Sequence, residues 1–145
     1  MNNIFKSCCL VLILAASTIA NAETGNLLIQ VSGLSHNRGQ VIANLFREHS
    51  DVMNIKTFYR RANTIINENM AAVVFSDLEF GVYAVSVFHD ENGNGELDHN
   101  MFKFPMEPLG FSNNFRFGLF TGLPSFEKLK FVFFRDSQPL DIIVR

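Results

Sequence analysis

The residues best suited to chemistry lie in one short stretch, Asp90 to Asp98, whose sequence is DENGNGELD. Side-chain oxygens stand at its first, third, fifth and ninth positions, glycine stands at the sixth, and the seventh can offer its backbone carbonyl. An EF-hand calcium loop has this ligand order as far as its ninth position. The sequence therefore predicts a calcium site, and the residues expected to supply its oxygen ligands are Asp90, Asn92, Asn94, Glu96 and Asp98.

The last part of the EF-hand pattern is missing from this chain. Position 12, which requires a bidentate glutamate, is Met101, and the flanking residues do not read as two helices. Further oxygens must then come from Asp77, Glu107, Asn113 or water. With two carboxylates in phase, we expect weak binding, with a dissociation constant of roughly 10⁻⁴ M or above. At calcium near ~1 mM the ion would add about 1.4 kcal/mol of stability, which is a structural role and not a catalytic one.

The same stretch also fits a plain solvated turn. Asn-Gly is the strongest short hairpin signal, and it occurs twice in succession here, at Asn92-Gly93 and Asn94-Gly95. A turn, however, needs no aspartate at both ends in phase with two asparagines. We therefore favour the calcium loop and keep the plain turn as the alternative.

Short runs of alternating apolar and polar residues predict that this loop follows a strand of an all-β fold. The clearest strand is Val82–His89, with Tyr83, Val85 and Val87 on one face. Residues 26–46 are typical of a hairpin, and residues 49–62 are the one plausible short helix. The other expected strands are Asn63–Asn67, Ala71–Ser76, Lys128–Phe134 and Leu140–Val144. About seven short strands and one short helix indicate a single-domain β-sandwich.

A long connection without clear alternation, Asp90 to Glu127, interrupts this regular spacing. It holds seven of the sixteen phenylalanines, namely Phe102, Phe104, Phe111, Phe115, Phe117, Phe120 and Phe126. The favoured interpretation is that this Phe-rich connection folds over one open end of the sandwich and buries several rings, at ~1.5–3 kcal/mol each. The alternative is an exposed apolar patch for a protein partner, a lipid or a small hydrophobic ligand.

The first 22 residues resemble a secretory signal peptide. They combine one early cation, Lys6, with an apolar run from Cys8 to Ala16 and a small-x-small end at Ala20-Asn21-Ala22. Cleavage after Ala22 leaves one domain, residues 23–145, in the periplasm or outside a bacterium. A retained membrane anchor is the alternative. After cleavage we expect no membrane span, because no second apolar run approaches ~20 residues.

Composition narrows the function classes further. Both cysteines, Cys8 and Cys9, lie in the leader, so the mature chain would have no disulfide, thiol nucleophile or zinc–thiolate site. Loss of Lys6 takes the net charge from −2 to −3, and the basic residues are scattered, which argues against a nucleic-acid partner.

The block from Asp77 through the loop resembles a family of small exported bacterial proteins known as domain of unknown function 2141. The matching residues are Asp77–Val85, with Leu-x-x-Gly-x-Tyr inside it, and Phe88-His89-Asp90. Further landmarks are Gly33-Leu34, Gly39-Gln40-Val41, Gly110–Asn114 and Pro124–Glu127. The resemblance implies an immunoglobulin-like or prealbumin-like β-sandwich, a form also known from carboxypeptidase-regulatory-like domains. It implies no activity, and a fold alone supplies none.

Common catalytic motifs are missing from the sequence, which has no Gly-x-Ser-x-Gly, no P-loop and no His-Glu-x-x-His. The four histidines, which lack metal-ligand spacing, are His36, His49, His89 and His99. We expect an exported, non-enzymatic binding or envelope accessory module with a structural calcium loop. A carrier of a small apolar ligand is the first alternative, and a hydrolase the second.

Overall fold

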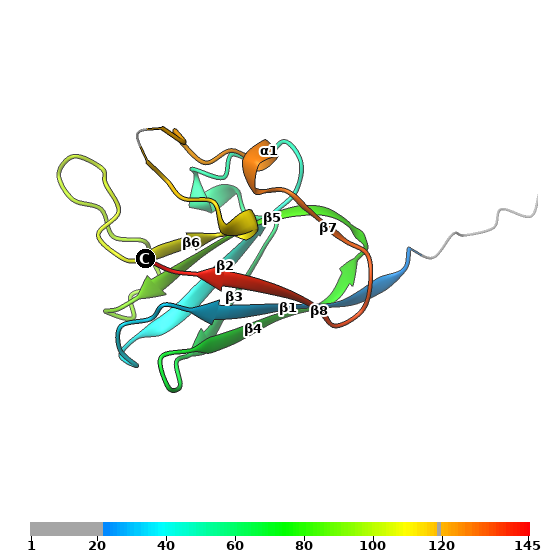
Figure 1. Ribbon diagram of the computed structural model, residues 1–145, viewed down its shortest axis with the longest axis horizontal. Helices are drawn as coiled ribbons and strands as arrows, with labels where there is room; N and C mark the ends of the chain where they lie inside the picture. The colour runs from blue at the N-terminus through cyan, green and yellow to red at the C-terminus, as the bar shows by residue number, and fades with distance from the viewer. Residues whose placement is uncertain (1–21, 119) are drawn as a thin grey trace, which may run out of the picture.

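Two β-sheets packed face to face form most of the computed structural model, which describes residues 22–118 and 120–145 (Figure 1). The strands are β1 (Thr24–Ser32), β2 (Gln40–Phe46), β3 (Arg60–Ile65), β4 (Ala71–Glu79), β5 (Gly81–Asp90), β6 (Leu109–Phe111), β7 (Phe131–Phe133) and β8 (Gln138–Ile143). The short helices are η1 (Ile55–Thr57), η2 (Ser112–Asn114) and α1 (Phe126–Leu129). The predicted all-β sandwich is confirmed, and it has one short α-helix, although not in the predicted place. The predicted leader, apart from Ala22, lies outside the described residues.

One sheet has the order β4-β1-β8, in which β1 and β8 are parallel. The other has the order β3-β2-β5-β6, and β7 also pairs with β5. β6 pairs with Ser86–Phe88 of β5, and β7 pairs with Gly81–Tyr83 of the same strand, so the two short strands pair with different parts of one long strand. β5 is therefore the strand that positions the connection following it.

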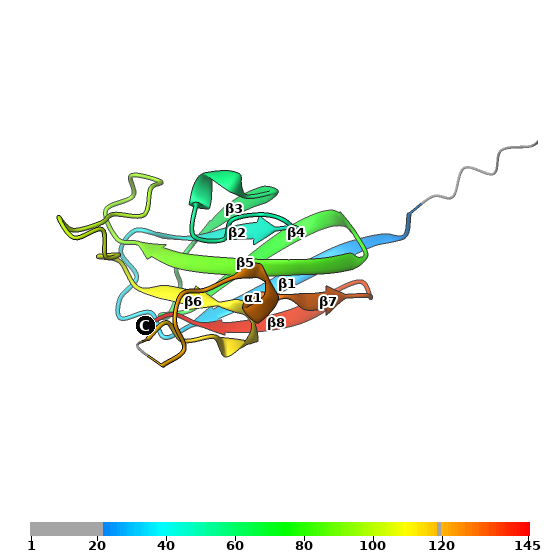
Figure 2. The same cartoon turned by 90° about the horizontal axis from the view of Figure 1, so that it is seen from above.

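The main core lies between the two sheets. Period-two alternation places one face of most strands in it, including Tyr83, Val85 and Val87 of β5, as the sequence predicts. β2 and β5 are buried on both faces. On the outer face, a second cluster covers the five-stranded sheet and consists of Phe46, Val52, Ala84, Phe111, Phe126 and Leu129. In Figure 2, α1 lies against this face of β5.

The predicted hairpin over residues 26–46 is wrong. β1 pairs with β4 and β8 in one sheet, whereas β2 pairs with β3 and β5 in the other. The connection 33–39 thus carries the chain between sheets. Gly33 has a φ of +84°, and a Cβ there would clash with the carbonyl oxygen of Val144 beside β8. The alternation of apolar and polar residues predicts which face of a strand is buried, but it does not predict which strands pair with it.

The predicted helix over residues 49–62 is also wrong. Only the 3₁₀ turn η1 forms, capped by the Asn54 side chain, and Phe58 is already extended. The Tyr59 N–H donates to the carbonyl of Leu45 at 2.7 Å, and the ladder of β3 with β2 begins at Arg60. Strand pairing thus overrides the local helical pattern.

Two segments near the end of the chain also depart from the prediction. The expected strand Lys128–Phe134 begins instead within α1 and becomes strand only in β7. The Phe-rich connection contains β6, which the sequence analysis did not predict. Both differences arise where packing on the outer face of β5 decides the local structure.

The connection after β5 projects from the same end of the sandwich as the C-terminus in both views (Figures 1 and 2). Within the described part of the chain, the helices are all too short to traverse a bilayer.

Candidate functional site

The acidic loop, residues 90–98, begins where β5 ends. Register places Asp90 opposite Gln40, the first residue of β2, and leaves the Asp90 side chain fully buried. Gly39 has a φ of +77°, and a Cβ there would overlap the carbonyl oxygen of Asp90. The backbone before β2 can therefore approach the start of the loop only because residue 39 is glycine.

The Asp90 carboxylate organises the loop through four hydrogen bonds. Its Oδ1 accepts from the backbone N–H groups of Gly93 at 2.8 Å and Asn94 at 3.1 Å. Its Oδ2 accepts from the N–H of Gly95 at 2.8 Å and from Nε2 of Gln40 at 2.7 Å. Three consecutive amides therefore point at one buried anion, which curls the backbone around it.

The polar side chains at the third, fifth and ninth positions meet on the exposed side of the loop. Nδ2 of Asn92 donates to Asp98 at 2.6 Å, and Nδ2 of Asn94 lies 3.2 and 3.3 Å from its two carboxylate oxygens. Oδ1 of each asparagine accepts the N–H two residues ahead, at Asn94 and Glu96. These local bonds set the loop geometry.

Glu107, one of the three additional ligands considered, lies directly behind the loop. Its two oxygens accept the N–H groups of Glu91 at 3.0 Å and Asp98 at 3.2 Å, which join the two ends of the loop. Burial raises the pKa of Glu107, the two N–H donors oppose this, and the charges of Asp90 and Asp98 add to the rise.

The other two additional ligands lie elsewhere. Asp77 belongs to β4 in the opposite sheet, and the Asn113 amide donates to the carbonyls of Lys128 and Lys130. Of the three residues that the sequence suggests as additional calcium ligands, Glu107 is the one that lies beside the loop.

A cation also stands beside the loop. Arg61 extends from β3, donates through Nη1 to the carbonyl of Gly95 at 3.1 Å, and through Nε to Oδ1 of Asn44 at 2.7 Å. Burial lowers the pKa of Arg61, and the nearby charge of Glu96 opposes that shift. Arg61 therefore fixes the carbonyl next to Glu96, the residue predicted to offer its own carbonyl to calcium.

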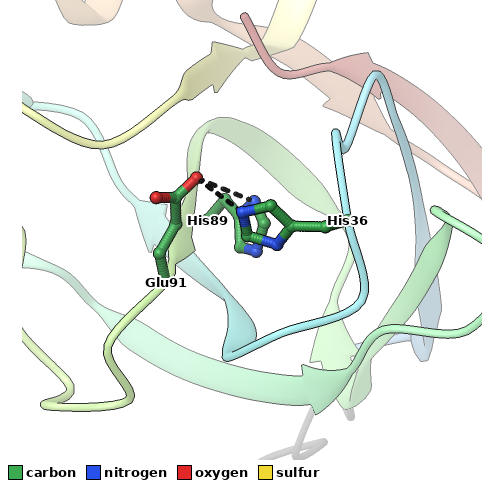
Figure 3. Close-up of side chains that lie close together, drawn as sticks. All are labelled: His36, His89 and Glu91. Atoms are coloured by element: carbon green, nitrogen blue, oxygen red, sulfur yellow. Dashed lines mark ion pairs between the residues drawn. The ribbon is translucent and has the colours of Figure 1, made fainter.

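The structure groups two histidines that sequence spacing left apart. His36, in the connection between β1 and β2, and His89, near the end of β5, both face Glu91 (Figure 3). His36 Nε2 lies 3.3 Å and His89 Nδ1 3.8 Å from Oε1 of Glu91. His49 and His99 are exposed. The spacing of the histidines in the sequence does not reveal this group, because it is the β2–β5 register that brings residue 36 close to residue 89.

An apolar cavity of about 170 Å³ lies between the outer face of β5 and the Phe-rich connection. Phe88, Phe104, Phe111 and Phe117 contribute to its lining, together with Leu97 of the acidic loop. Ser86 also lines it, and its buried Oγ has no hydrogen-bond partner.

The seven phenylalanines of the connection divide by burial. Phe111 and Phe126 are buried in the outer cluster, Phe115 packs against it half-buried, and the rest are exposed. The exposed four are Phe102, Phe104, Phe117 and Phe120. The favoured prediction, burial of several rings, thus holds for part of the connection, and the alternative of an exposed patch describes the remainder.

Comparison with known proteins places the chain in a family. No curated protein and no solved structure matches it significantly, so the immunoglobulin-like or prealbumin-like relationship stays a prediction. A family model does match, over residues 29–140, which include the sandwich strands from β1 into β8 and the whole acidic loop. The chain therefore belongs to the bacterial family described as "Uncharacterized protein conserved in bacteria (DUF2141)".

Proposed function

We propose that this protein is an exported, non-enzymatic binding module, acting in the periplasm or outside the cell as an envelope accessory protein. In this proposal calcium bound to the acidic loop stabilises the end of the sandwich from which the Phe-rich connection leaves. The export part rests on the leader pattern of residues 1–22.

The observation that supports a calcium loop best is the Asp90 carboxylate. It turns three successive backbone N–H groups inward. The turn brings Asn92, Asn94 and Asp98 within hydrogen-bonding distance of one another. The oxygens of these side chains match the hard donor set that calcium prefers, so the residues present fit the ion.

The same contacts explain why binding should be weak. Asp98 already accepts hydrogen bonds from both asparagine amides, and a cation would have to replace them. Arg61 adds a positive charge next to Gly95. In favour of binding, burial raises the pKa of Glu107, and the nearby charges of Asp90 and Asp98 add to that rise. A cation among the three carboxylates would relieve this repulsion.

A calorimetric titration of the purified protein with calcium tests this proposal. We expect one site per chain, with a dissociation constant of roughly 10⁻⁴ M. Asp98→Asn removes one carboxylate but keeps an acceptor for the asparagine amides, and should weaken binding at least about 10-fold. The matched control is Asp141→Asn, an exposed residue of β8 in the other sheet. Equal calcium affinity for both variants would contradict the proposal.

A second candidate function, carriage of a small apolar ligand, is favoured by the unpartnered Ser86 hydroxyl in the apolar cavity. A buried hydroxyl without a partner costs about 1–3 kcal/mol, which a ligand with one polar group would recover. The volume is close to that of a cavity of ~150 Å³ that accepts benzene. The expected ligand class is therefore one apolar ring bearing a hydrogen-bonding group.

Phenol is the simplest probe of this second function. Its binding can be followed by displacement of an environment-sensitive apolar dye. Ser86→Ala should weaken phenol binding by about 5-fold or more, the value of one hydrogen bond, while Ser76→Ala, at an exposed serine of β4, should not. Binding of phenol with equal affinity to both variants would place it outside this cavity.

A further inference from the structure

Three side chains with metal-binding atoms converge at the start of the acidic loop, and one of them, Glu91, belongs to the loop itself. They are His36, His89 and Glu91, and one ligand atom from each lies within 4.8 Å of the other two (Figure 3). The two imidazole rings have centroids 4.8 Å apart and planes inclined at 58°, so they are not stacked. Both rings direct a nitrogen at the same carboxylate oxygen of Glu91.

His89 is held in the orientation that a metal ligand needs. Its side chain is fully buried, and Nε2 lies 2.7 Å from the carbonyl oxygen of Arg38. A carbonyl only accepts, so Nε2 carries the hydrogen, and in the neutral ring the lone pair is on Nδ1. A backbone carbonyl on the far nitrogen is the usual outer partner of a metal-bound histidine.

The Nδ1 atom of His89 has no hydrogen-bond partner although it is buried. Its nearest acidic oxygen, Oε1 of Glu91, is 3.8 Å away and is itself an acceptor when ionised. Two acceptors facing each other across a gap repel, unless a proton or a metal cation stands between them. This buried, unpartnered nitrogen is an observation independent of the clustering.

We propose that His36, His89 and Glu91 bind a first-row divalent transition metal of the Zn²⁺ class. The expected ligand atoms are Nε2, Nδ1 and Oε1 respectively. Tetrahedral ligands at about 2.0–2.2 Å from zinc are about 3.3–3.6 Å apart. The two separations from Glu91, 3.3 and 3.8 Å, lie within a few tenths of an ångström of this range. The ligand atoms of the two histidines lie within 4.8 Å of each other, so the partly exposed His36 ring would move toward His89 on binding.

The donor types separate this site from the calcium loop. Two imidazole nitrogens favour zinc and its neighbours, whereas calcium takes oxygen ligands. Glu91 is not one of the residues expected to bind calcium, and the proposal does not rest on calcium binding. The side chains of His36 and Glu91 are 29% and 39% exposed, which gives the ion access and leaves room for water as a further ligand.

Zinc titration by calorimetry tests the proposal, using protein purified after expression of the complete chain. Titrations with and without about 2 mM calcium separate zinc uptake by this cluster from uptake by the oxygen ligands of the acidic loop. We expect one Zn²⁺ per chain, and at least about 10-fold weaker binding in both His36→Gln and Glu91→Gln. Both positions are partly exposed, so the variants should fold. The matched controls, His49→Gln and Glu48→Gln, change exposed residues outside the cluster.

A second measurement reports the ligands directly. Cobalt(II), bound in place of zinc, should give visible d–d absorption in wild type and in both controls, and lose intensity in His36→Gln and Glu91→Gln. Wild-type zinc affinity in either of those two variants would overturn the three-ligand site. So would the failure of wild type to take up stoichiometric zinc.

Discussion

The connection after β5 has two parts that are built in opposite ways: the acidic loop, residues 90–98, and the phenylalanine-containing remainder, residues 102–126, to which the name Phe-rich connection is limited below. In the acidic loop, the buried carboxylate of Asp90 accepts hydrogen bonds from three backbone N–H groups of the loop and so sets its fold. The Phe-rich connection depends instead on Phe111 and Phe126, which are buried in a cluster formed by other elements. Its remaining surface is apolar and exposed, as at Phe102 and Phe120.

This difference separates the residues that stabilise the fold from those whose exposed side chains are free to bind a partner. In the acidic loop nearly every polar group has a local partner, so an ion there would change stability first. In the Phe-rich connection the buried rings of Phe111 and Phe126 anchor the segment together with the pairing of β6, and the exposed rings should contribute little to folding. Changes to the two regions should therefore have different consequences for stability.

The largest effect should come from truncating an anchor of the Phe-rich connection. Phe111→Ala should lower the free energy of unfolding by about 3–4 kcal/mol, because it opens a cavity in the outer cluster. Phe102→Ala, the same change in the same segment, should alter it by less than about 0.5 kcal/mol. The side chains are 8% and 78% exposed. Urea denaturation midpoints measure both, and similar losses would break the division into anchors and exposed rings.

Removal of the carboxylate that organises the acidic loop should come next. Asp90→Ala leaves three backbone N–H groups and Gln40 without their acceptor, and should cost about 2–4 kcal/mol in EDTA. The loss should grow in calcium, because a ligand is also removed. Urea unfolding of Asp90→Ala and of Asp141→Ala, each with and without calcium, measures this. A loss no greater than that of the exposed control would mean that water replaces Asp90 without cost.

The sequence patterns predicted those features of the fold and of the acidic loop that depend on residues close together in the chain. Tyr83, Val85 and Val87 share the core-facing side of β5, as their alternation predicts. The side chains of Asn92, Asn94 and Asp98 come together in the acidic loop, as their spacing in the sequence predicts. Partners distant in the chain were not predictable from these patterns. The true neighbours of β1, and the approach of His36 to His89, depend on which sheet each strand joins.

The smallest effect concerns an exposed counterpart of Asp90 between β7 and β8. The N–H of Asn26, which donates to Oδ1 of Asp136 at 2.7 Å, lowers the pKa of this carboxyl from its usual 3.8. The ionised form thus favours folding. Its contribution is fully present above the unfolded value and disappears as pH falls through the folded value.

Thermal midpoints measured from neutral pH to below the usual value test this sign. Asp136→Asn should lose stability slightly at neutral pH and be less sensitive than wild type to acid. Asp141→Asn serves as the control in the same strand region. A variant whose acid sensitivity equals that of wild type would show that water screens Asp136 fully, unlike the buried Asp90.

The claim that calcium binds the acidic loop can be tested on the wild-type protein alone, by its thermal midpoint in EDTA, in magnesium and in calcium. With about 2 mM calcium and a dissociation constant near ~0.1 mM, the ion adds about 1.8 kcal/mol. The midpoint should then rise by about 5 °C in calcium. It should change little in magnesium, which requires a more regular octahedral site. Equal midpoints in all three solutions would contradict the claim and leave Asp90–Asp98 as a turn held by its own hydrogen bonds.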